Sequence, residues 1–314
     1  MKASVGAVIE TKPASQWLQV FVELSKLRLS SLVLITVAVG WLTARFSGVT
    51  PVGLAAPGLL SLFAAMFGVL GTAAGACALN QVLERELDGR MNRTRARPLP
   101  SQRISVDGAL TFGLLAILVG LVILLVGCGP LAALLGFLSA LVYVAVYTPL
   151  KRLTTLNTMV GAVSGALPPM IGYVAATARI DAHAWALFAI LFVWQIPHFL
   201  AIAWLHREDY ERAGMRMLGV VDADGSLTMR QLLLFGLLLI PTSLLPVMTG
   251  LATLPYAIVA LVLGLWFALG GLRLMLSKTR EDARRLFYVS LFYLPLLLVA
   301  LLADIVLFGG PEGT

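Results

Sequence analysis

The sequence predicts an all-α polytopic membrane protein. Of its 314 residues, 59% are hydrophobic and only 12% are charged, whereas soluble domains are about half apolar and about a quarter charged. The mean hydropathy is +0.93. Apolar stretches of about 17 to 25 residues, the length that crosses a bilayer, recur along the whole chain. This composition excludes a soluble globular protein.

We predict nine transmembrane helices around a central cavity. Their approximate ranges are 29–46, 54–79, 106–126, 131–147, 156–177, 184–204, 232–248, 254–274 and 287–308. Residues 1–24 form a polar N-terminal tail with neither a cleavable signal pattern nor the composition of a transit peptide. Residues 25–308 then form a single intramembrane domain, and residues 309–314 a short C-terminal tail.

The basic residues set the orientation. A net charge of +7 suggests nucleic acid in a soluble protein, but here it indicates topology signals and contacts to anionic lipid headgroups. If the N-terminus is cytoplasmic, only Arg45 and Arg179 of the 23 lysines and arginines fall outside. We therefore expect a cytoplasmic N-terminus, an outside C-terminus and a bacterial inner membrane protein that binds no nucleic acid.

The first helices carry packing and anchoring signals. Lys26, just before the first span, is read as snorkelling to the membrane interface. The second span is rich in small residues that allow close helix packing, namely Gly68, Gly71, Ala74, Gly75 and Ala78. Cys77 and Cys128 are too few and too differently placed for a disulfide framework or a zinc site.

The end of the second span carries a polar stripe. Asn80, Glu84 and Asp88 recur every four residues, which places them on one helical face about 6 Å apart along the axis. Two carboxylates and an amide suit Mg²⁺, which is held by one or two carboxylates together with substrate phosphate oxygens. The alternative is a solvated helix end. Asn80 argues against it, because an amide near hydrocarbon needs a partner.

Arginines follow the stripe at once: Arg90, Arg93, Arg95 and Arg97, before Pro98. Guanidinium groups bind phosphate oxygens bidentately. Arg93 and Arg97 are the better candidates for a diphosphate, because the turn before the proline can fold them back over the helix end. Arg90 and Arg95 are expected to be surface charges.

Lys151 lies in a short basic turn before the fifth span. Free backbone N–H groups at a helix start favour an anion there, so Lys151 is a candidate diphosphate ligand, although topology explains its charge almost as well. In the fifth span, Pro168 and Pro169 are expected to break or bend the helix.

The sixth span contains intramembrane polar residues, which are functional candidates by default. Trp194, Gln195 and His198 lie deep in it. If the helix continues into the next loop, His198 and Asp209 share a face about 16 Å apart. The alternatives are a histidine that only packs between helices at His198 and a solvated one at His206.

Together these motifs resemble the intramembrane prenyltransferase superfamily of the ubiquinone-biosynthesis type. The stripe, the run NRTRARPLP, the turn YTPLKR and the segment WQIPHF to REDYERAGMRML occur in this order over residues 25–308. Quinone-type members carry a second aspartate pair after the sixth helix. Here Asp209 is followed four residues on by Ala213, and the segment is instead similar to the haem O synthase branch.

The resemblance implies farnesyl transfer from farnesyl diphosphate to a vinyl group of haem B, with addition of water. It implies Mg²⁺ as cofactor, with Asn80, Glu84, Asp88 and Asp209 as ligands. Arg93, Arg97 and Lys151 would neutralise the diphosphate. His198 and, less directly, His206 would bind the iron or a propionate of haem, which is a substrate. Membrane lipid, and haem A synthase or a terminal oxidase, are the implied partners.

Two other functions share some of these features. A quinone or chlorophyll-type prenyltransferase has the same magnesium stripe but accepts an aromatic or chlorin acceptor. A cation-coupled transporter also places carboxylates in helices, but near the bilayer midplane. Here the stripe lies at the cytoplasmic edge, which favours an enzyme.

Overall fold

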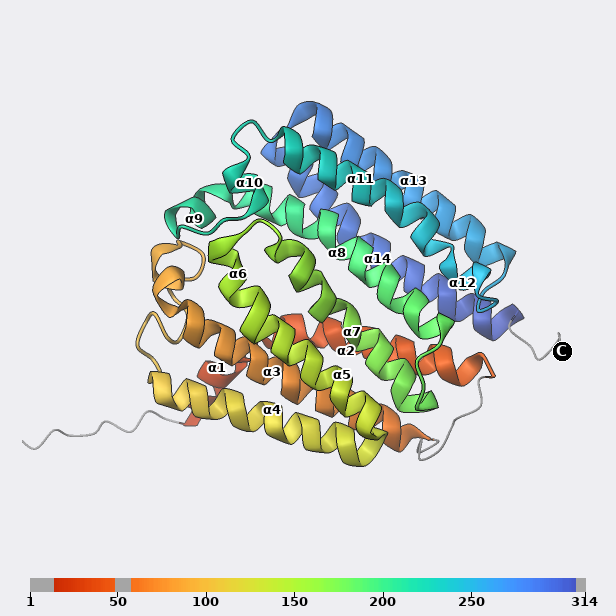
Figure 1. Ribbon diagram of the computed structural model, residues 1–314, viewed down its shortest axis with the longest axis horizontal. Helices are drawn as coiled ribbons and strands as arrows, with labels where there is room; N and C mark the ends of the chain where they lie inside the picture. Colours follow the sequence, from red (N-terminus) through yellow and green to blue (C-terminus); the bar gives the residue numbers. More distant parts are fainter. Residues whose placement is uncertain (1–13, 49–57, 309–314) are drawn as a thin grey trace, which may run out of the picture.

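In the computed structural model, residues 14–48 and 58–308 are described, and every regular element within them is helical. The predicted all-α class is therefore confirmed for this part of the chain (Figure 1). The helices are α1 (Ala14–Leu24), α2 (Leu27–Phe46), α3 (Leu59–Arg90), α4 (Val106–Cys128), α5 (Pro130–Leu141), the π-helix η1 (Val142–Tyr147), α6 (Thr148–Leu153), α7 (Asn157–Thr177), α8 (Ala182–Leu205), α9 (Arg207–Arg212), α10 (Leu218–Val221), α11 (Ser226–Ser243), α12 (Leu245–Met248), α13 (Leu254–Ser277) and α14 (Arg280–Phe308).

Eight helical segments in the described ranges are long and apolar enough to cross a membrane. The α5–η1–α6 and α11–α12 segments each count as one of these. The apolar part of α2, Ser30–Phe46, is shorter, so a ninth span stays a prediction. The tail residues 1–13 and 309–314, and the start of the predicted second span, lie outside the described residues.

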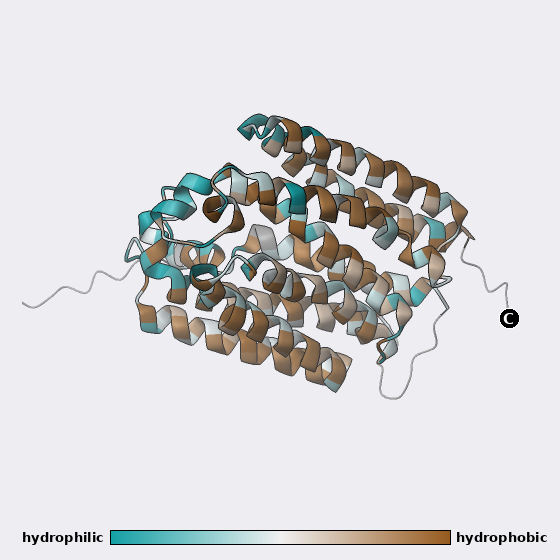
Figure 2. Ribbon diagram, turned by 45° about the horizontal axis from the view of Figure 1, so that its top comes forward, coloured by the Kyte–Doolittle hydropathy of each residue, from teal (hydrophilic) through white to brown (hydrophobic). Residues whose placement is uncertain are grey.

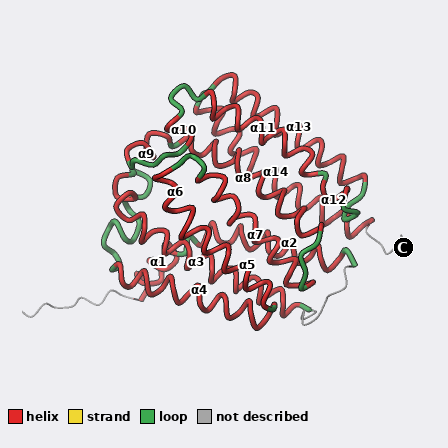
Figure 3. The backbone as a smooth tube through the Cα atoms, in the orientation of Figure 1, coloured by secondary structure: helices red, strands yellow, loops and turns green. Residues whose placement is uncertain are grey.

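The two central helices are α7 and α8, which pack against each other and are largely buried. Helices α2, α3 and α5 contact α7, whereas α11 and α14 contact α8. The tube in Figure 3 shows the long helices running side by side between two ends of the bundle. Helix α1 lies at one end and the last turn of α14 at the other (Figure 1).

Hydrophilic residues gather at the end of the bundle that carries α9 and the loop after α3, while the long helices are mostly hydrophobic (Figure 2). We call this the polar end. Helix α1, within the predicted tail, also packs there: Val20 and Leu24 are buried with Ala78 of α3 and Leu99 of the following loop. The apolar side chains of α1 thus hold the turn between α1 and α2 beside the stripe.

Small residues let α3 and α4 approach closely, as the sequence predicts. A Cβ on Gly75 would lie 2.4 Å from the carbonyl oxygen of Gly113, and one on Gly120 would lie 2.6 Å from that of Gly68. No side chain fits in such a gap. This contact fixes the direction of α3 and therefore the position of the stripe on its last turns.

Of the two outcomes expected at Pro168 and Pro169, a break does not occur, because α7 runs unbroken from Asn157 to Thr177. A bend there stays a prediction. A proline within a helix frees the carbonyl four residues earlier. For Pro168 that carbonyl belongs to Ser164, and it accepts a hydrogen bond of 3.0 Å from the Ser139 hydroxyl of α5. A neighbouring side chain thus replaces the missing backbone bond, as is common in membrane helices.

Asp304 of α14, for which the sequence suggests no role, caps another helix. Its buried carboxylate accepts hydrogen bonds from Thr253 N at 2.7 Å, Thr253 Oγ1 at 2.8 Å and Tyr256 N at 3.1 Å. These backbone amides belong to the start of α13, where N–H groups have no partner within the helix. The last helix therefore fastens α13 at the end opposite the polar end.

Candidate active site

The stripe residues lie on the last turns of α3, which continues to Arg90 without a break. Asn80 and Asp88 are fully buried, and Glu84 is 4% exposed. The neighbouring Arg85 and Glu86 side chains are 46% and 77% exposed, as expected for an ordinary helix surface. The alternative of a solvated helix end is therefore wrong for the stripe itself.

Glu84 is paired with Lys151. The lysine Nζ lies 2.9 Å from Oε1 and 3.2 Å from Oε2 of Glu84. Lys151 comes from α6, so the YTPLKR turn folds directly over the stripe. The same Nζ lies 4.6 Å from the ring centroid of Tyr147, which adds a cation–π contact. Neither side chain of the ion pair is more than 13% exposed.

Asp88 is paired with Arg97. Its two carboxylate oxygens lie 2.8 and 2.7 Å from Nη1 of the arginine. The loop after α3 makes this possible, because the Thr94 hydroxyl donates to the Asp88 carbonyl oxygen at 2.8 Å and so closes the helix end. Arg97 therefore folds back over the stripe as the sequence predicts, while Arg90 and Arg95 are exposed.

Asn80 is held between two partners that sequence analysis does not assign to the site. Its Nδ2 donates to Thr148 Oγ1 at 3.0 Å, and its Oδ1 accepts from Lys26 Nζ at 3.2 Å. Thr148 in turn donates to the carbonyl oxygen of Tyr143 at 2.8 Å. Burial lowers the pKa of Lys26 below its ordinary value. The amide thus links α2, α3 and α6.

Helix α9 brings Asp209 to the loop after α3. Asp209 Oδ1 accepts a hydrogen bond of 3.4 Å from the backbone N–H of Asn92, and Arg93 donates to Tyr210 Oη at 3.2 Å. Partial burial opposes ionisation of Asp209, but hydrogen bonds from Arg212 and Asn92 outweigh it and lower the pKa of the carboxyl group. Arg93 is exposed and does not contact the stripe.

A π-helix forms one wall of the site. Residues 142–147 adopt this wider helix immediately before Thr148 and Lys151. Single π-turns often mark functional sites because they change which side chains face a cavity. The Tyr143 and Tyr147 rings lie 5.5 Å apart, centroid to centroid. A Cβ on Gly161 of α7 would lie only 2.8 Å from the Tyr147 ring, so the ring is closely confined.

His198 lies in α8, stacked between aromatic rings. Its ring centroid is 4.8 Å from that of Trp194 and 5.3 Å from that of Phe287. Ser290 uses its hydroxyl hydrogen for the carbonyl oxygen of Phe287 at 2.6 Å, so it accepts from His198 Nδ1 at 2.7 Å. With the proton on Nδ1, the neutral ring presents a lone pair on Nε2.

The expected continuous stripe from His198 to Asp209 is wrong. Helix α8 ends at Leu205, and the His206 carbonyl accepts from the backbone N–H groups of Asp209 and Tyr210 at the start of α9. The chain changes direction there because His206 leaves the helical conformation (φ −113°, ψ 22°). Burial, reinforced by the charge of Arg93, lowers the pKa of His206.

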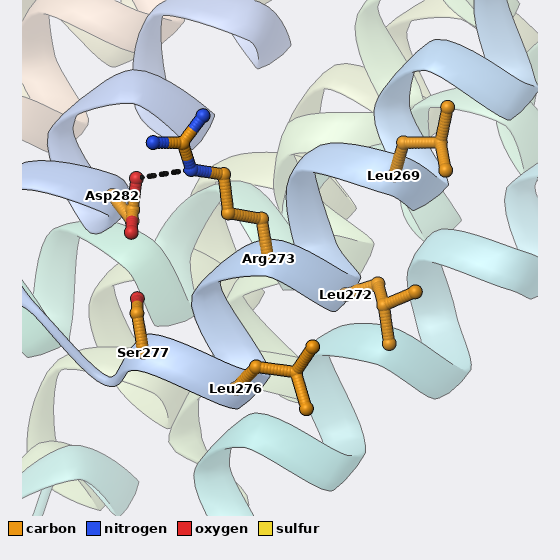
Figure 4. A pocket seen from close by; sticks show the side chains of 6 residues that line it. All are labelled: Leu269, Leu272, Arg273, Leu276, Ser277 and Asp282. Atoms are coloured by element: carbon orange, nitrogen blue, oxygen red, sulfur yellow. Dashed lines mark ion pairs between the residues drawn. The ribbon is translucent and has the colours of Figure 1, made fainter.

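A shallow pocket of about 530 Å³ lies elsewhere, between the end of α13 and the start of α14. Figure 4 shows three leucines along α13 and the ion pair of Arg273 with Asp282, in which Nε and Oδ1 are 2.8 Å apart. None of the stripe residues lines it. The pair joins the two helices across their connecting turn.

Comparisons with known proteins identify the family of the chain. The model of the UbiA prenyltransferase family matches residues 29–297. The chain belongs to the UbiA prenyltransferase family. Among UbiA relatives, a protein of Solibacter usitatus is 42% identical over 90% of this chain and 98% of its own, and one of Opitutus terrae is 42% identical over 90% and 94%. Both are named protoheme IX farnesyltransferase.

Solved structures of other proteins share the fold. A digeranylgeranylglyceryl phosphate synthase is 17% identical, with a TM-score of 0.76 over 92% of this chain and 98% of its own. A UbiA homologue from Archaeoglobus fulgidus, solved with GPP and Mg²⁺, is 13% identical, with a TM-score of 0.58 over 90% and 99%. At these identities the likeness concerns the fold alone.

The residues of the stripe fit a magnesium ion only together with an anion. Their oxygen donors are the type that Mg²⁺ prefers, and they are buried on one helix face. However, each of the three is bonded to a cationic side chain, namely Lys26, Lys151 or Arg97. Those cations need another partner when the metal takes their oxygen atoms, and a diphosphate supplies one.

Proposed function

We propose that this protein transfers the farnesyl group of farnesyl diphosphate to a vinyl group of haem B, with addition of water, to make haem O. The observation that carries the proposal is the pairing of the buried stripe with Lys151 and Arg97 at the polar end. The relatives named protoheme IX farnesyltransferase, similar over nine-tenths of the chain, support the choice of acceptor.

In this proposal Asn80, Glu84 and Asp88 hold Mg²⁺, with Asp209 as a further ligand from α9. Bound there, the metal neutralises charge that develops on the leaving diphosphate. Lys151 and Arg97 would bind the phosphate oxygens, and Arg93 would do so from the surface of the loop. These preorganised cations stabilise the leaving group as the carbon–oxygen bond breaks.

The reaction then balances without an added oxidant. Diphosphate leaves with the electron pair of the carbon–oxygen bond, which produces an allylic cation on the farnesyl group. The electron pair of the haem vinyl group forms the new carbon–carbon bond at its terminal carbon. The cation left beside the porphyrin takes up water, which loses a proton and becomes the hydroxyl group of the side chain.

His198 is the proposed haem contact. Its hydrogen bond to Ser290 leaves Nε2 for iron or for a propionate, and imidazole is a common axial ligand. His206 lies beyond the last residue of α8, beside the charge of Arg93. It is therefore the weaker proposal and is directed to a propionate.

We further propose a multi-pass protein of the bacterial inner membrane, with the polar end at the cytoplasm and the C-terminus outside. The distribution of basic residues supports this orientation. The placement of α1 and the last turn of α14 at opposite ends of the bundle supports an odd number of crossings. The product suggests haem A synthase or the assembly of a terminal oxidase as partners.

The test is product analysis with membranes that contain the recombinant protein. Haem B and farnesyl diphosphate are supplied with Mg²⁺, and the haem is analysed by mass spectrometry. We expect haem O with magnesium and none when it is omitted. Prenylation of a quinone precursor in place of haem would instead identify an aromatic prenyltransferase.

A further inference from the structure

The pocket between the end of α13 and the start of α14, which we call the α13–α14 groove, has an apolar wall and a polar wall. Leu269, Leu272 and Leu276 follow one another at intervals of three and four residues, so they form one leucine row along α13. All three are exposed, Leu276 to 75%. On a membrane-spanning helix such a row faces the acyl chains of the bilayer, which are as apolar as leucine itself.

Arg273 forms part of the polar wall and has more hydrogen-bond donors than partners. Its Nε lies 2.8 Å from Asp282 Oδ1, and Figure 4 shows this pair beside the leucine row. Within the described ranges, neither Nη nitrogen has a hydrogen-bond partner, so four of the five N–H donors of the guanidinium group remain. The side chain is 63% exposed. The remaining donors suit a phosphate group, which arginine binds bidentately.

The arginines around the α13–α14 groove outnumber the carboxylates. Asp282 is shared by two of them, since its Oδ1 lies 2.8 Å from Arg273 Nε and 3.3 Å from Arg285 Nη1. The other acid, Glu281, lies 2.5 Å from Arg285. Arg284 is exposed, and no carboxylate of the described residues lies at ion-pair distance from it. Three arginines thus accompany two carboxylates, which favours a ligand with a net negative charge.

The turn beside the α13–α14 groove holds the end of α8. Trp204 Nε1 donates to the Lys278 carbonyl oxygen at 3.1 Å, and Arg280 Nη2 donates to the Leu205 carbonyl oxygen at 2.8 Å. Arg280 Nη1 also lies 3.5 Å from Glu208 of α9. These contacts place the groove at the polar end of the bundle. A ligand bound there adjoins the corner at which α8 ends and α9 begins.

We infer that the α13–α14 groove binds one anionic phospholipid, such as phosphatidylglycerol, from the leaflet at the polar end. The phosphate oxygens accept hydrogen bonds from the Nη groups of Arg273, and an acyl chain lies along the leucine row. Basic pockets between membrane helices bind anionic headgroups in this way. A zwitterionic phospholipid has the same chains, but the unbalanced arginine repels its cationic headgroup. An arginine that only snorkelled would need no such groove beside it.

The experiment titrates phosphatidylglycerol into the purified full-length protein in detergent micelles and counts bound lipid by native mass spectrometry. Phosphatidylcholine with the same chains tests the charge of the headgroup. Glycerol 3-phosphate tests the headgroup without chains. The Tm is measured with and without each ligand on the same samples, because a ligand that binds only the folded state raises it.

Three variants separate the groove from general attraction to the polar end. Arg273→Gln removes the phosphate donor, and Leu276→Gln puts a polar group on the leucine row without changing any charge. The matched control is Arg85→Gln. Arg85 is also an exposed arginine beside a carboxylate, 3.8 Å from Glu86, but it lies on α3. This control therefore removes the same charge from outside the groove.

We expect Arg273→Gln to weaken phosphatidylglycerol binding about 10-fold, the usual effect of a lost charged hydrogen bond. Leu276→Gln should weaken it several-fold, because apolar contact is lost. Arg85→Gln should bind like the unsubstituted protein. Phosphatidylglycerol should raise the Tm of the unsubstituted protein, and phosphatidylcholine and glycerol 3-phosphate should not.

Four results overturn the inference. Equal binding of the two phospholipids would mean that the groove holds ordinary bilayer lipid, and tight binding of glycerol 3-phosphate would mean a site for a free anion. An unchanged affinity in a folded Arg273→Gln or Leu276→Gln variant would place the lipid elsewhere. An equal loss in Arg85→Gln would mean general charge attraction. If Arg273→Gln does not fold, Leu276→Gln and the two phospholipids still decide. Haem O synthesis is assayed separately and is not tested by these results.

Discussion

Nη1 of Arg97 lies within 2.8 Å of both carboxylate oxygens of Asp88, a residue that is itself fully buried at the end of α3. The ion pair therefore closes the site where the metal is proposed to bind. A carboxylate in this position is either a structural anchor for the loop or a ligand whose partner is exchanged, and substitution separates the two.

Asp88→Asn should abolish haem O formation, because the amide lacks the negative charge that holds Mg²⁺, and without the metal the charge on the leaving diphosphate is not neutralised. We expect a fall of at least about 100-fold in the rate, comparable to the loss of other charge-stabilising groups. The assay is haem O production in membranes at equal protein levels. Glu86→Gln is the control, since that side chain is 77% exposed on the same helix. Full activity of Asp88→Asn would remove the basis of the site.

Glu84 and Lys151 should show strong coupling in stability. Either Glu84→Gln or Lys151→Met leaves one buried charge without its partner, which costs about 3–5 kcal/mol. The double variant removes both charges and should recover most of that loss. The free energy of unfolding in detergent micelles provides the double-mutant cycle. Additive losses in the double variant would mean that the ion pair of 2.9 Å is not maintained in solution.

His198→Gln should weaken haem binding without altering magnesium pyrophosphate binding. The imidazole Nε2 is the proposed contact to haem, and the glutamine lacks an equivalent nitrogen lone pair. A Soret titration measures the haem, and calorimetry measures the pyrophosphate. His183→Gln is a useful control, since His183 bonds to the Thr249 carbonyl oxygen outside the site. Unchanged haem affinity with a lowered Tm would show that His198 only packs.

Acid should loosen α1 from the polar end. The hydrogen bond and charge of Arg103 lower the pKa of Glu23 below its ordinary value of 4.5. A lowered carboxyl pKa means that the stabilisation is complete above about pH 4.5 and is lost as the pH falls through the folded-state pKa. The protection of the α1 amides, which is the intrinsic exchange rate at each pH divided by the observed rate, should therefore fall below that pH. In Glu23→Gln, the exchange should already be faster at neutral pH and show no such step.

Asp304→Ala should destabilise the protein without affecting substrate binding. The change leaves the N–H groups of Thr253 and Tyr256 and one hydroxyl without their acceptor. Each unsatisfied buried group costs about 1–3 kcal/mol, so the Tm should fall by several degrees. Pyrophosphate and haem affinities measured below the Tm should stay the same. A selective loss of either affinity would mean that Asp304 acts on the site.

The helices and the stripe could be predicted because their signals are local. Apolar runs of sufficient length identify spans, and the four-residue repeat of Asn80, Glu84 and Asp88 identifies a shared face. The break after Leu205 was missed because nothing in the sequence near His206 marks a helix end, neither glycine nor proline. Two prolines in α7 suggested a break, whereas the hydroxyl of Ser139, in a different helix, donates to the carbonyl oxygen that Pro168 leaves without a backbone partner.

Apart from the contact of Arg97, the pairings of the stripe could not be predicted, because the partners are distant in sequence. Lys26 and Asn80 are 54 residues apart, Lys151 and Glu84 are 67 apart, and His198 and Ser290 are 92 apart. Such contacts depend on loop conformation and helix packing, which periodicity does not report. The π-helix before Lys151 also changes the register by which side chains face the site. Lys26 had only one local signal, a lysine directly before an apolar span.

Asp304 and the stripe carboxylates are the same kind of buried group, but they have different kinds of hydrogen-bond partner. Asp304 accepts from two backbone amides and a hydroxyl, which are fixed to α13 and have no other destination. Glu84 and Asp88 accept instead from the tips of long, flexible side chains. The hydrogen bonds of Asp304 therefore hold one end of the bundle together permanently, whereas the ion pairs of Glu84 and Asp88 at the other end are exchanged when a ligand binds. Substitutions that improve heat resistance should accumulate around Asp304, whereas changes in substrate preference require substitutions around Glu84 and Asp88.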